Sequence, residues 1–248
     1  MTVFRNVVFV AAIAGLVAGL VLAAMQAFST TPLIVAAEAY EGGGGAHDHP
    51  NDHDHAETGG EAAHSHDHGE EAWTPEDGFE REFYTAAANV VTAIGFALVL
   101  VAVSEFAGGI ASWRQGLMWG FAGFAVFTLA PGLGLPPELP GMPAADLAAR
   151  QAWWIGTVAA TAAGLALIVF GRSVALAALG VALIVAPHIV GAPQPESHDT
   201  AVPAELHHRF VVAVTVTNLL FWLILGAVAG TVRRRFSVSL GDARGSLA

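Results

Sequence analysis

The sequence predicts an all-α integral membrane protein with about six transmembrane helices, arranged as three helical hairpins, and a disordered His-rich loop between the first two helices. Three observations predict this fold. Hydrophobic residues make up 54% of the 248 residues and charged residues only 12%, whereas a soluble domain carries about 25% charged residues. The charges are excluded from six long runs. The one long polar stretch, residues 42–72, interrupts a single membrane domain that spans residues 1–248.

Six runs without Asp, Glu, Arg or Lys are each long enough to cross the hydrocarbon core of a bilayer, which takes about 20 apolar residues as a helix. They are residues 6–37, 83–104, 115–137, 151–171, 173–195 and 210–232. Buried helices of a soluble protein would need a polar face, and these runs leave almost none. Arg5 followed by an apolar run resembles the start of a signal peptide. The run is far longer, however, than the apolar h-region of a signal peptide, which has about 7–15 residues. We therefore expect a retained helix.

Three of these runs carry glycines spaced four residues apart. The pairs are Gly15 and Gly19, Gly116 and Gly120, and Gly226 and Gly230. Small residues at this spacing let the backbones of two membrane helices approach closely. The alternative is that an Ala- and Gly-rich sequence produces such pairs by chance.

The distribution of arginine predicts the topology, because positive charge in short loops stays cytoplasmic. With the N-terminus inside, seven arginines fall on the inner side and three, Arg81, Arg150 and Arg209, on the outer side. Nineteen of the 21 acidic residues then lie outside. We expect both termini to be cytoplasmic and the His-rich loop to face out. Each outer arginine directly precedes an outward-to-inward helix, and this weak repeat suggests the three similar hairpins.

Several classes of function are excluded or disfavoured. The chain has no Cys and no Lys, so it can form neither disulfides nor a P-loop with its phosphate-binding Lys. A net charge of −11 argues against nucleic acid as a partner. Neither His-Glu-x-x-His nor Gly-x-Ser-x-Gly occurs, so we expect no enzymatic activity and no organic cofactor.

The loop between the first two helices carries the chemical signal. Seven of the eleven histidines lie within 22 residues and alternate with carboxylates: His47, His49, His53, His55, His64, His66 and His68. Imidazole binds divalent transition metals, and carboxylate adds charge and further ligation. The composition also predicts disorder without metal, so we expect a flexible collector of ions. The alternative is a solvated linker with no metal role.

Ionisable residues at membrane depth are rare and usually functional. His188 is the one titratable imidazole in the predicted spans, and Glu38 and Glu41 follow the first span directly. We therefore add these three residues to the candidate metal ligands and expect a funnel from the loop toward His188. The alternatives are that His188 anchors at the headgroup level and that both glutamates are solvated. The polar residues at a similar depth are Gln26, Asn89, Gln151 and Asn218, with the thioether of Met25.

Motifs along almost the whole chain resemble the CbtA family, which comprises proposed cobalt transporter subunits of bacteria and archaea. They are Pro32-Leu33-Ile34, Ala37-Glu38-Ala39-Tyr40-Glu41, the acidic His cluster, Trp73-Thr74-Pro75-Glu76-Asp77-Gly78, Leu129-Ala130-Pro131, Leu135-Pro136-Pro137-Glu138-Leu139-Pro140-Gly141, Ala149-Arg150-Gln151 with Trp153-Trp154, Ala186-Pro187-His188, Gly191-Ala192-Pro193-Gln194-Pro195, Val202-Pro203-Ala204-Glu205-Leu206, and Asn218 with Phe221-Trp222. The resemblance implies cobalt uptake for cobalamin synthesis across a prokaryotic cytoplasmic membrane. It also implies about five spans, one fewer than the runs counted above, and a small single-span partner with its own His-rich end, CbtB.

From the residues alone, the cargo is a divalent transition metal. Cobalt is favoured by the resemblance, and nickel or zinc stay open. The leading hypothesis is import through or with this bundle, in contact with membrane lipid and with the CbtB-like subunit or further copies of the chain. The alternatives are metal efflux and a membrane-anchored metal-binding or sensing module that hands ions to a partner.

Overall fold

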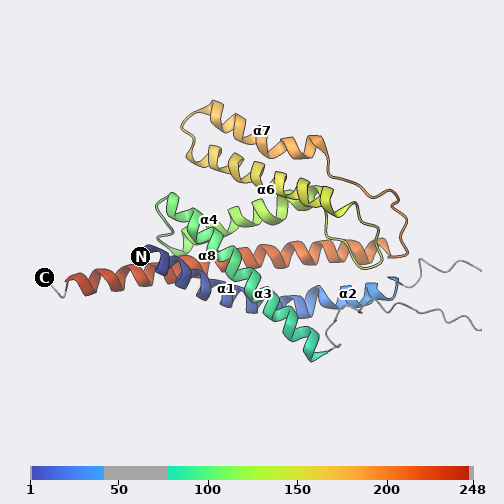
Figure 1. Cartoon of the computed structure of the whole chain (residues 1–248), viewed down its shortest axis with the longest axis horizontal. Helices are drawn as coiled ribbons and strands as arrows, with labels where there is room; N and C mark the ends of the chain where they lie inside the picture. Colours follow the sequence, from blue (N-terminus) through green and yellow to red (C-terminus); the bar gives the residue numbers. More distant parts are fainter. Residues whose placement is uncertain (1, 42–77, 246–248) are drawn as a thin grey trace, which may run out of the picture.

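The computed structural model describes residues 2–41 and 78–245, with side chains for residues 4–41 and 78–236. The described chain is helical and contains no strand (Figure 1). Its elements are α1 (Thr2–Ser29), α2 (Thr31–Glu38), α3 (Phe79–Phe106), α4 (Trp113–Phe124), the π-helical turn η2 (Ala125–Leu129), α5 (Ala130–Gly134), α6 (Leu147–Phe170), α7 (Val174–Val190) and α8 (Ala204–Gly245). The all-helical membrane fold that the composition predicts is confirmed.

Five segments of the described chain are long and apolar enough to cross a membrane. They are Phe4–Ser29, Phe79–Phe106, Trp113–Gly134, Leu147–Phe170 and Ala204–Phe236. The sixth predicted span, residues 173–195, yields the shorter apolar helix Val174–Val190. It stops there because Gly191 takes a positive φ of 86° and Pro193 and Pro195 follow, neither of which has an N–H for a helical bond. At 1.5 Å per residue α7 is about 25 Å long, short of the roughly 30 Å hydrocarbon core. The prediction of six spans is therefore not confirmed.

Local signals in the sequence set where the helices begin. Ser112, Asp146 and Ser173 precede α4, α6 and α7, and the side chain of each accepts a hydrogen bond from the backbone N–H three residues later. Such N-caps satisfy amide groups that the first turn of a helix leaves without partners. The first predicted run, residues 6–37, divides at Thr30 into α1 and α2, and Pro32 lies in the first turn of α2.

The third span changes its winding part-way across. In the turn η2 the N–H of Ala130 bonds to the carbonyl of Ala125, five residues earlier, instead of four. Pro131 follows at the start of α5 and has no N–H with which to restore the regular pattern. The segment Trp113–Gly134 is therefore one span made of two α-helical pieces joined by a π-turn.

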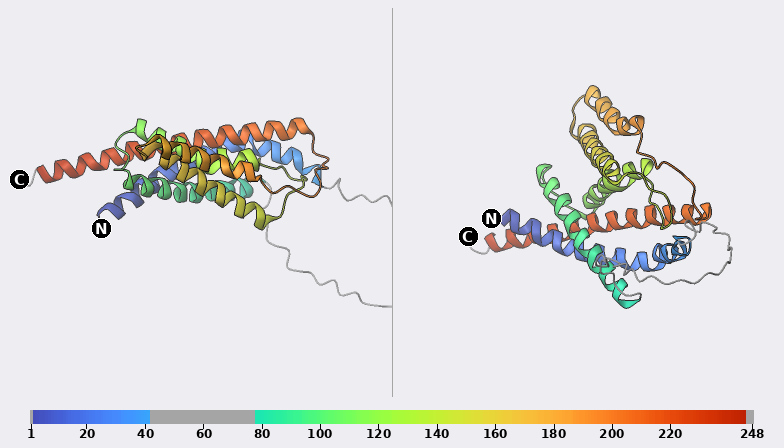
Figure 2. Two further views of the ribbon diagram at one scale, coloured as in Figure 1. Left: turned by 90° about the horizontal axis from the view of Figure 1, so that it is seen from above. Right: turned by 45° about the vertical axis from the view of Figure 1, so that its right-hand side comes forward.

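The helices pack in pairs that differ from the predicted hairpins. In the described chain α1 packs against α3 and α8, α4 packs against α8, and α6 packs against α7 (Figures 1 and 2). The first predicted hairpin corresponds to α1 and α3. The other two are not confirmed, because the main neighbour of α4 is α8 and that of α7 is α6. The α6–α7 pair meets the rest of the bundle mainly through η2 and α5.

The three predicted glycine pairs lie at two of these crossings, which confirms their role. A Cβ on Gly19 of α1 would lie 2.6 Å from the Cα of Val90 in α3, and one on Gly15 would meet the backbone of Ile94. At the second crossing Gly116 and Gly120 of α4 face the main chain of α8 around Gly226. At both crossings, α1 with α3 and α4 with α8, the two backbones touch directly, which is possible only because glycine has no side chain.

Candidate transport path

An ion pair joins the end of α2 to the start of α3, the two helix ends that flank the His-rich segment. Glu38 is the last residue of α2, and its carboxylate pairs with Arg81 in the first turn of α3 at 2.5 Å. We call this end of the bundle the loop end. The N- and C-termini lie at the opposite end, the terminal end (Figure 1). The ion pair therefore fixes the point at which residues 42–77 join the bundle.

Two connecting segments, residues 135–146 and 191–203, cover the loop end. Their residues Leu139 and Val202 are buried against Ala37 of α2 and Phe210 of α8. The ring Nε2–H of His207 donates to the carbonyl of Pro137 at 3.1 Å. The hydroxyl of Thr200 donates to the carbonyl of Gly141, and Arg150 pairs with Glu138 at 3.0 Å. The loop end is therefore closed by packed chain next to the anchors of the His-rich segment.

Below this cover, a pair of carboxamides joins α1 to α3. The side-chain amide of Asn89 donates to the Oε1 atom of Gln26 at 2.6 Å. Asn218 of α8 donates to the carbonyl of Val214 in its own helix, and Gln151 is exposed at the start of α6. Of the four polar residues that the sequence places at this depth, Gln26 and Asn89 therefore form a hydrogen bond with each other, whereas Gln151 and Asn218 do not join them. Met25 packs against the main hydrophobic core.

The middle of the bundle is filled by an aromatic cluster, defined as Phe96, Phe127, Phe221 and Trp222. The indole of Trp222 stacks on Phe127 with centroids 5.4 Å apart and an interplanar angle of 8°, and it lies 5.0 Å from the ring of Phe96. Its Nε1–H donates to the hydroxyl of Thr128 in the π-turn at 3.3 Å. Trp222 is only 2% exposed. This cluster joins α3, η2 and α8 between the carboxamide pair and the terminal end.

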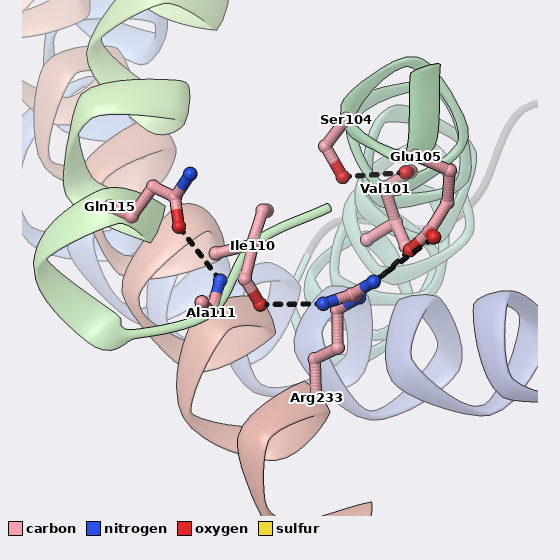
Figure 3. A network of polar contacts seen from close by, with 7 residues as sticks. All are labelled: Val101, Ser104, Glu105, Ile110, Ala111, Gln115 and Arg233. Carbon is pink, nitrogen blue, oxygen red and sulfur yellow. Dashed lines mark hydrogen bonds and ion pairs between the residues drawn. The ribbon is translucent and has the colours of Figure 1, made fainter. Parts of the chain in front are cut away.

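An ion pair lies at the terminal end, where α3, its connection to α4, and α8 meet (Figure 3). The guanidinium of Arg233 donates from Nε and Nη2 to both oxygens of Glu105, at 2.8 and 3.0 Å, and from Nη1 to the carbonyl of Ile110 at 3.0 Å. Both side chains are about three-quarters buried. Gly109 has a φ of 77°, and a Cβ there would collide with the guanidinium. The connection between α3 and α4 therefore packs directly against the guanidinium of Arg233.

Sequence reasoning assigned Glu105 and Arg233 to separate loops and did not pair them. The available signal was their position, because each is the first charge after a charge-free run that enters from the loop end, 83–104 for Glu105 and 210–232 for Arg233. Two opposite charges that end runs of almost equal length fall at the same depth. About 24 residues separate Arg81 from Glu105 and Arg209 from Arg233, which is about 36 Å of helix in each case.

Comparison with known families decides the identity. A family model described as a probable cobalt transporter subunit (CbtA) matches residues 4–234. The chain belongs to the CbtA family. This confirms the resemblance carried by the sequence motifs. No curated protein and no solved structure matches the chain.

In this CbtA protein the candidate metal ligands fall into separate groups. The seven loop histidines, His47 to His68, lie outside the described residues. Glu38 pairs with Arg81, and Glu41 is exposed at the edge of the described chain. His188 is half-buried near the end of α7, with its ring edge-on to Trp153 at 5.9 Å between centroids. Within residues 2–41 and 78–236, no three His, Asp or Glu side chains come close enough to hold one ion. Metal binding by these residues therefore stays a prediction.

Proposed function

We propose that this CbtA protein is the membrane subunit of an uptake transporter for divalent transition metals, with cobalt as its cargo. The observation that carries the proposal is the family match, which extends over all five apolar spans. The proposal places the loop end outside a prokaryotic cytoplasmic membrane and both termini in the cytoplasm, as the arginine distribution predicts. The proposal treats the protein as a transporter and not as an enzyme.

The His-rich segment is the proposed collector of ions. Its alternating imidazoles and carboxylates suit cobalt, nickel and zinc alike, so family membership and not ligand chemistry favours cobalt. The Glu38–Arg81 pair holds both ends of the segment beside the covered loop end. Captured ions are thereby concentrated where a path through the bundle has to begin.

A partner subunit is a further part of the proposal. The aromatic cluster packs in the middle of the bundle, and the described residues form no metal site of three or more His, Asp or Glu. Ion passage therefore requires helix movement, additional ligands, or both. A single-span subunit with a His-rich end, of the CbtB kind, would supply ligands, and further copies of this chain are the other candidate.

Deleting residues 42–71 is expected to lower cobalt uptake at limiting cobalt and to leave it near the parent level at saturating cobalt. A collector raises the local ion concentration and is dispensable once the ion is abundant. Uptake of radioactive cobalt by cells that express the full chain and the deletion, measured over a range of cobalt concentrations, tests this. A deletion that stays at background even at saturating cobalt would contradict the collector role. Titration of a peptide of residues 42–71 with cobalt, nickel and zinc is the matched binding measurement.

His188→Ala is expected to reduce the maximal uptake rate and to leave the cobalt concentration for half-maximal uptake unchanged, because His188 lies in a helix and not in the collector. His188→Gln, which keeps a polar side chain, is the companion variant. If uptake by His188→Ala equals that of the parent at every cobalt concentration, His188 is only an interfacial residue packed on Trp153.

The sensing-module alternative is separated from transport by liposomes. A transporter loads cobalt into sealed vesicles that contain the purified chain with its partner subunit. A module that only binds metal leaves the vesicle lumen empty. Efflux predicts cobalt movement in the opposite direction across vesicles of known orientation.

A further inference from the structure

The ion pair at the terminal end places a carboxylate where an ion crossing the bundle would leave it. Within residues 2–41 and 78–236, Glu105 is the only acidic residue at the terminal end, since the others lie near the loop end. Ionisable residues at the border of a membrane bundle are costly and are usually retained for function. A carboxylate in this place is the natural last ligand for a cation that crosses from the loop end.

Arg233 engages both oxygens of that carboxylate. Its guanidinium binds both oxygens of Glu105 and also a backbone carbonyl, Ile110 O. Bidentate pairs of this kind are among the stronger ionic contacts in proteins, especially when they are partly buried. A divalent cation at Glu105 would repel the positive guanidinium at close range in a partly desolvated setting. A cation and Arg233 therefore compete for Glu105.

The same contact also holds three structural elements together. Glu105 belongs to the end of α3, Ile110 to the connection between α3 and α4, and Arg233 to α8 (Figure 3). The connection turns at Gly108 and Gly109, both with positive φ, and α3 ends where the N–H of Gly109 bonds to the carbonyl of Ser104. Removing the guanidinium from Glu105 therefore frees α3 from α8 at this end.

From these contacts we propose that Glu105 is the exit ligand for the cargo cation and that Arg233 is the latch that covers it. In the conformation described, Arg233 keeps the terminal end closed. A divalent cation that reaches Glu105 displaces Arg233 and loosens the contact between α3 and α8, which opens the exit. The inference rests on the proposed transport function and assigns one step of it to two residues.

A single thiol beside the latch reports its opening. The chain has no Cys, and the side chain of Ser104 is fully buried next to Glu105. Ser104→Cys introduces the only thiol with little change in volume. The full chain with this substitution is purified and placed in lipid nanodiscs, where a water-soluble maleimide reaches both faces. The labelling rate is measured with cobalt ions and, as the ionic control, with magnesium ions.

The expected result is that cobalt speeds labelling by about fivefold or more, the lower end of typical ligand-induced couplings. In the Glu105→Gln background, labelling is expected to be fast without metal and insensitive to cobalt. In the Arg233→Gln background, labelling is also expected to be fast without metal, because the latch is absent. Glu138→Gln, which breaks the comparable pair at the loop end, is the matched control and should keep the parent response.

The outcomes distinguish the latch from a merely structural ion pair. A structural pair predicts faster labelling in both variants and no cobalt effect in the parent, which would overturn the proposal. A cobalt response that persists in Glu105→Gln would also overturn it, since another residue would then hold the ion. Cobalt uptake by the parent chain is measured in parallel. Uptake without a labelling response rejects the latch alone, and the absence of both rejects the proposed function as well.

Discussion

Replacing Gly226 by leucine is expected to force α4 and α8 apart and to destabilise the folded protein strongly. A Cβ at Gly226 would collide with the carbonyl oxygen of Gly116 and lie 2.9 Å from the backbone N of Gly120. No choice of rotamer removes this clash, because Cβ itself causes it and the opposing atoms are main chain. Overpacking a core costs about 1–3 kcal/mol even where side chains can adjust, so we expect a loss of about 3 kcal/mol or more.

The measurement is thermal denaturation of the detergent-solubilised protein, followed by the monodisperse peak in size-exclusion chromatography. A loss of about 3 kcal/mol corresponds to a fall in Tm of roughly 6–12 °C for a chain of this size. The matched control is Gly156→Leu in α6, since Gly156 is also a helical glycine but has no atom within 4 Å of an added Cβ. Equal melting of the two variants would mean that the α4–α8 crossing is looser than described.

Trp222→Ala is expected to destabilise the protein by a similar amount. The indole is 2% exposed, contacts Phe96 and Phe127, and donates a hydrogen bond to Thr128. Truncating a buried Trp or Phe to Ala costs about 3–5 kcal/mol through lost contacts and the cavity left behind. The cavity would also open the aromatic cluster that separates the polar groups at the two ends of the bundle.

The same denaturation assay measures this loss, and Trp113→Ala supplies the control because Trp113 is 49% exposed. Thr128→Val isolates the hydrogen bond, which is worth about 1 kcal/mol. We expect Trp222→Ala to lower Tm well below Thr128→Val, with Trp113→Ala near the parent. Similar shifts for the two tryptophan variants would show that the aromatic cluster adds nothing beyond ordinary apolar contact.

Much of the helix content was predictable, because charges are costly in a hydrocarbon layer and so mark where spans end. Glu105 and Arg233 directly follow runs 83–104 and 210–232, and they close the apolar parts of α3 and α8. The glycine pairs predicted close crossings for a similar reason, since only a missing side chain allows backbone contact. The length of α7 differs from the sequence prediction because the run 173–195 contains no charge, although Gly191 and the two prolines after it end the helix at Val190.

Which helices pack against each other could not be predicted from the sequence, for a physical reason. A membrane helix is apolar around its whole circumference, so hydropathy does not mark which face meets which neighbour. The predicted hairpins followed chain order, whereas α4 packs on α8, about 100 residues later in the sequence. The Glu105–Arg233 pair joins α3 to α8. The lengths of the charge-free runs place both residues at one depth, but only the structure shows that their helices meet there.

The π-turn in the third span has a consequence for anyone who maps this protein residue by residue. A π-turn takes up one more residue than an α-turn, and each residue advances a helix by about 100°. Positions before Ala125 and after Leu129 therefore do not share one helical wheel. A cysteine scan along Trp113–Gly134, straightforward in a chain without native thiols, should show a periodic reactivity pattern whose phase slips by one residue at this turn. Assigning lipid-facing and protein-facing sides with a single wheel would misplace every position on one side of it.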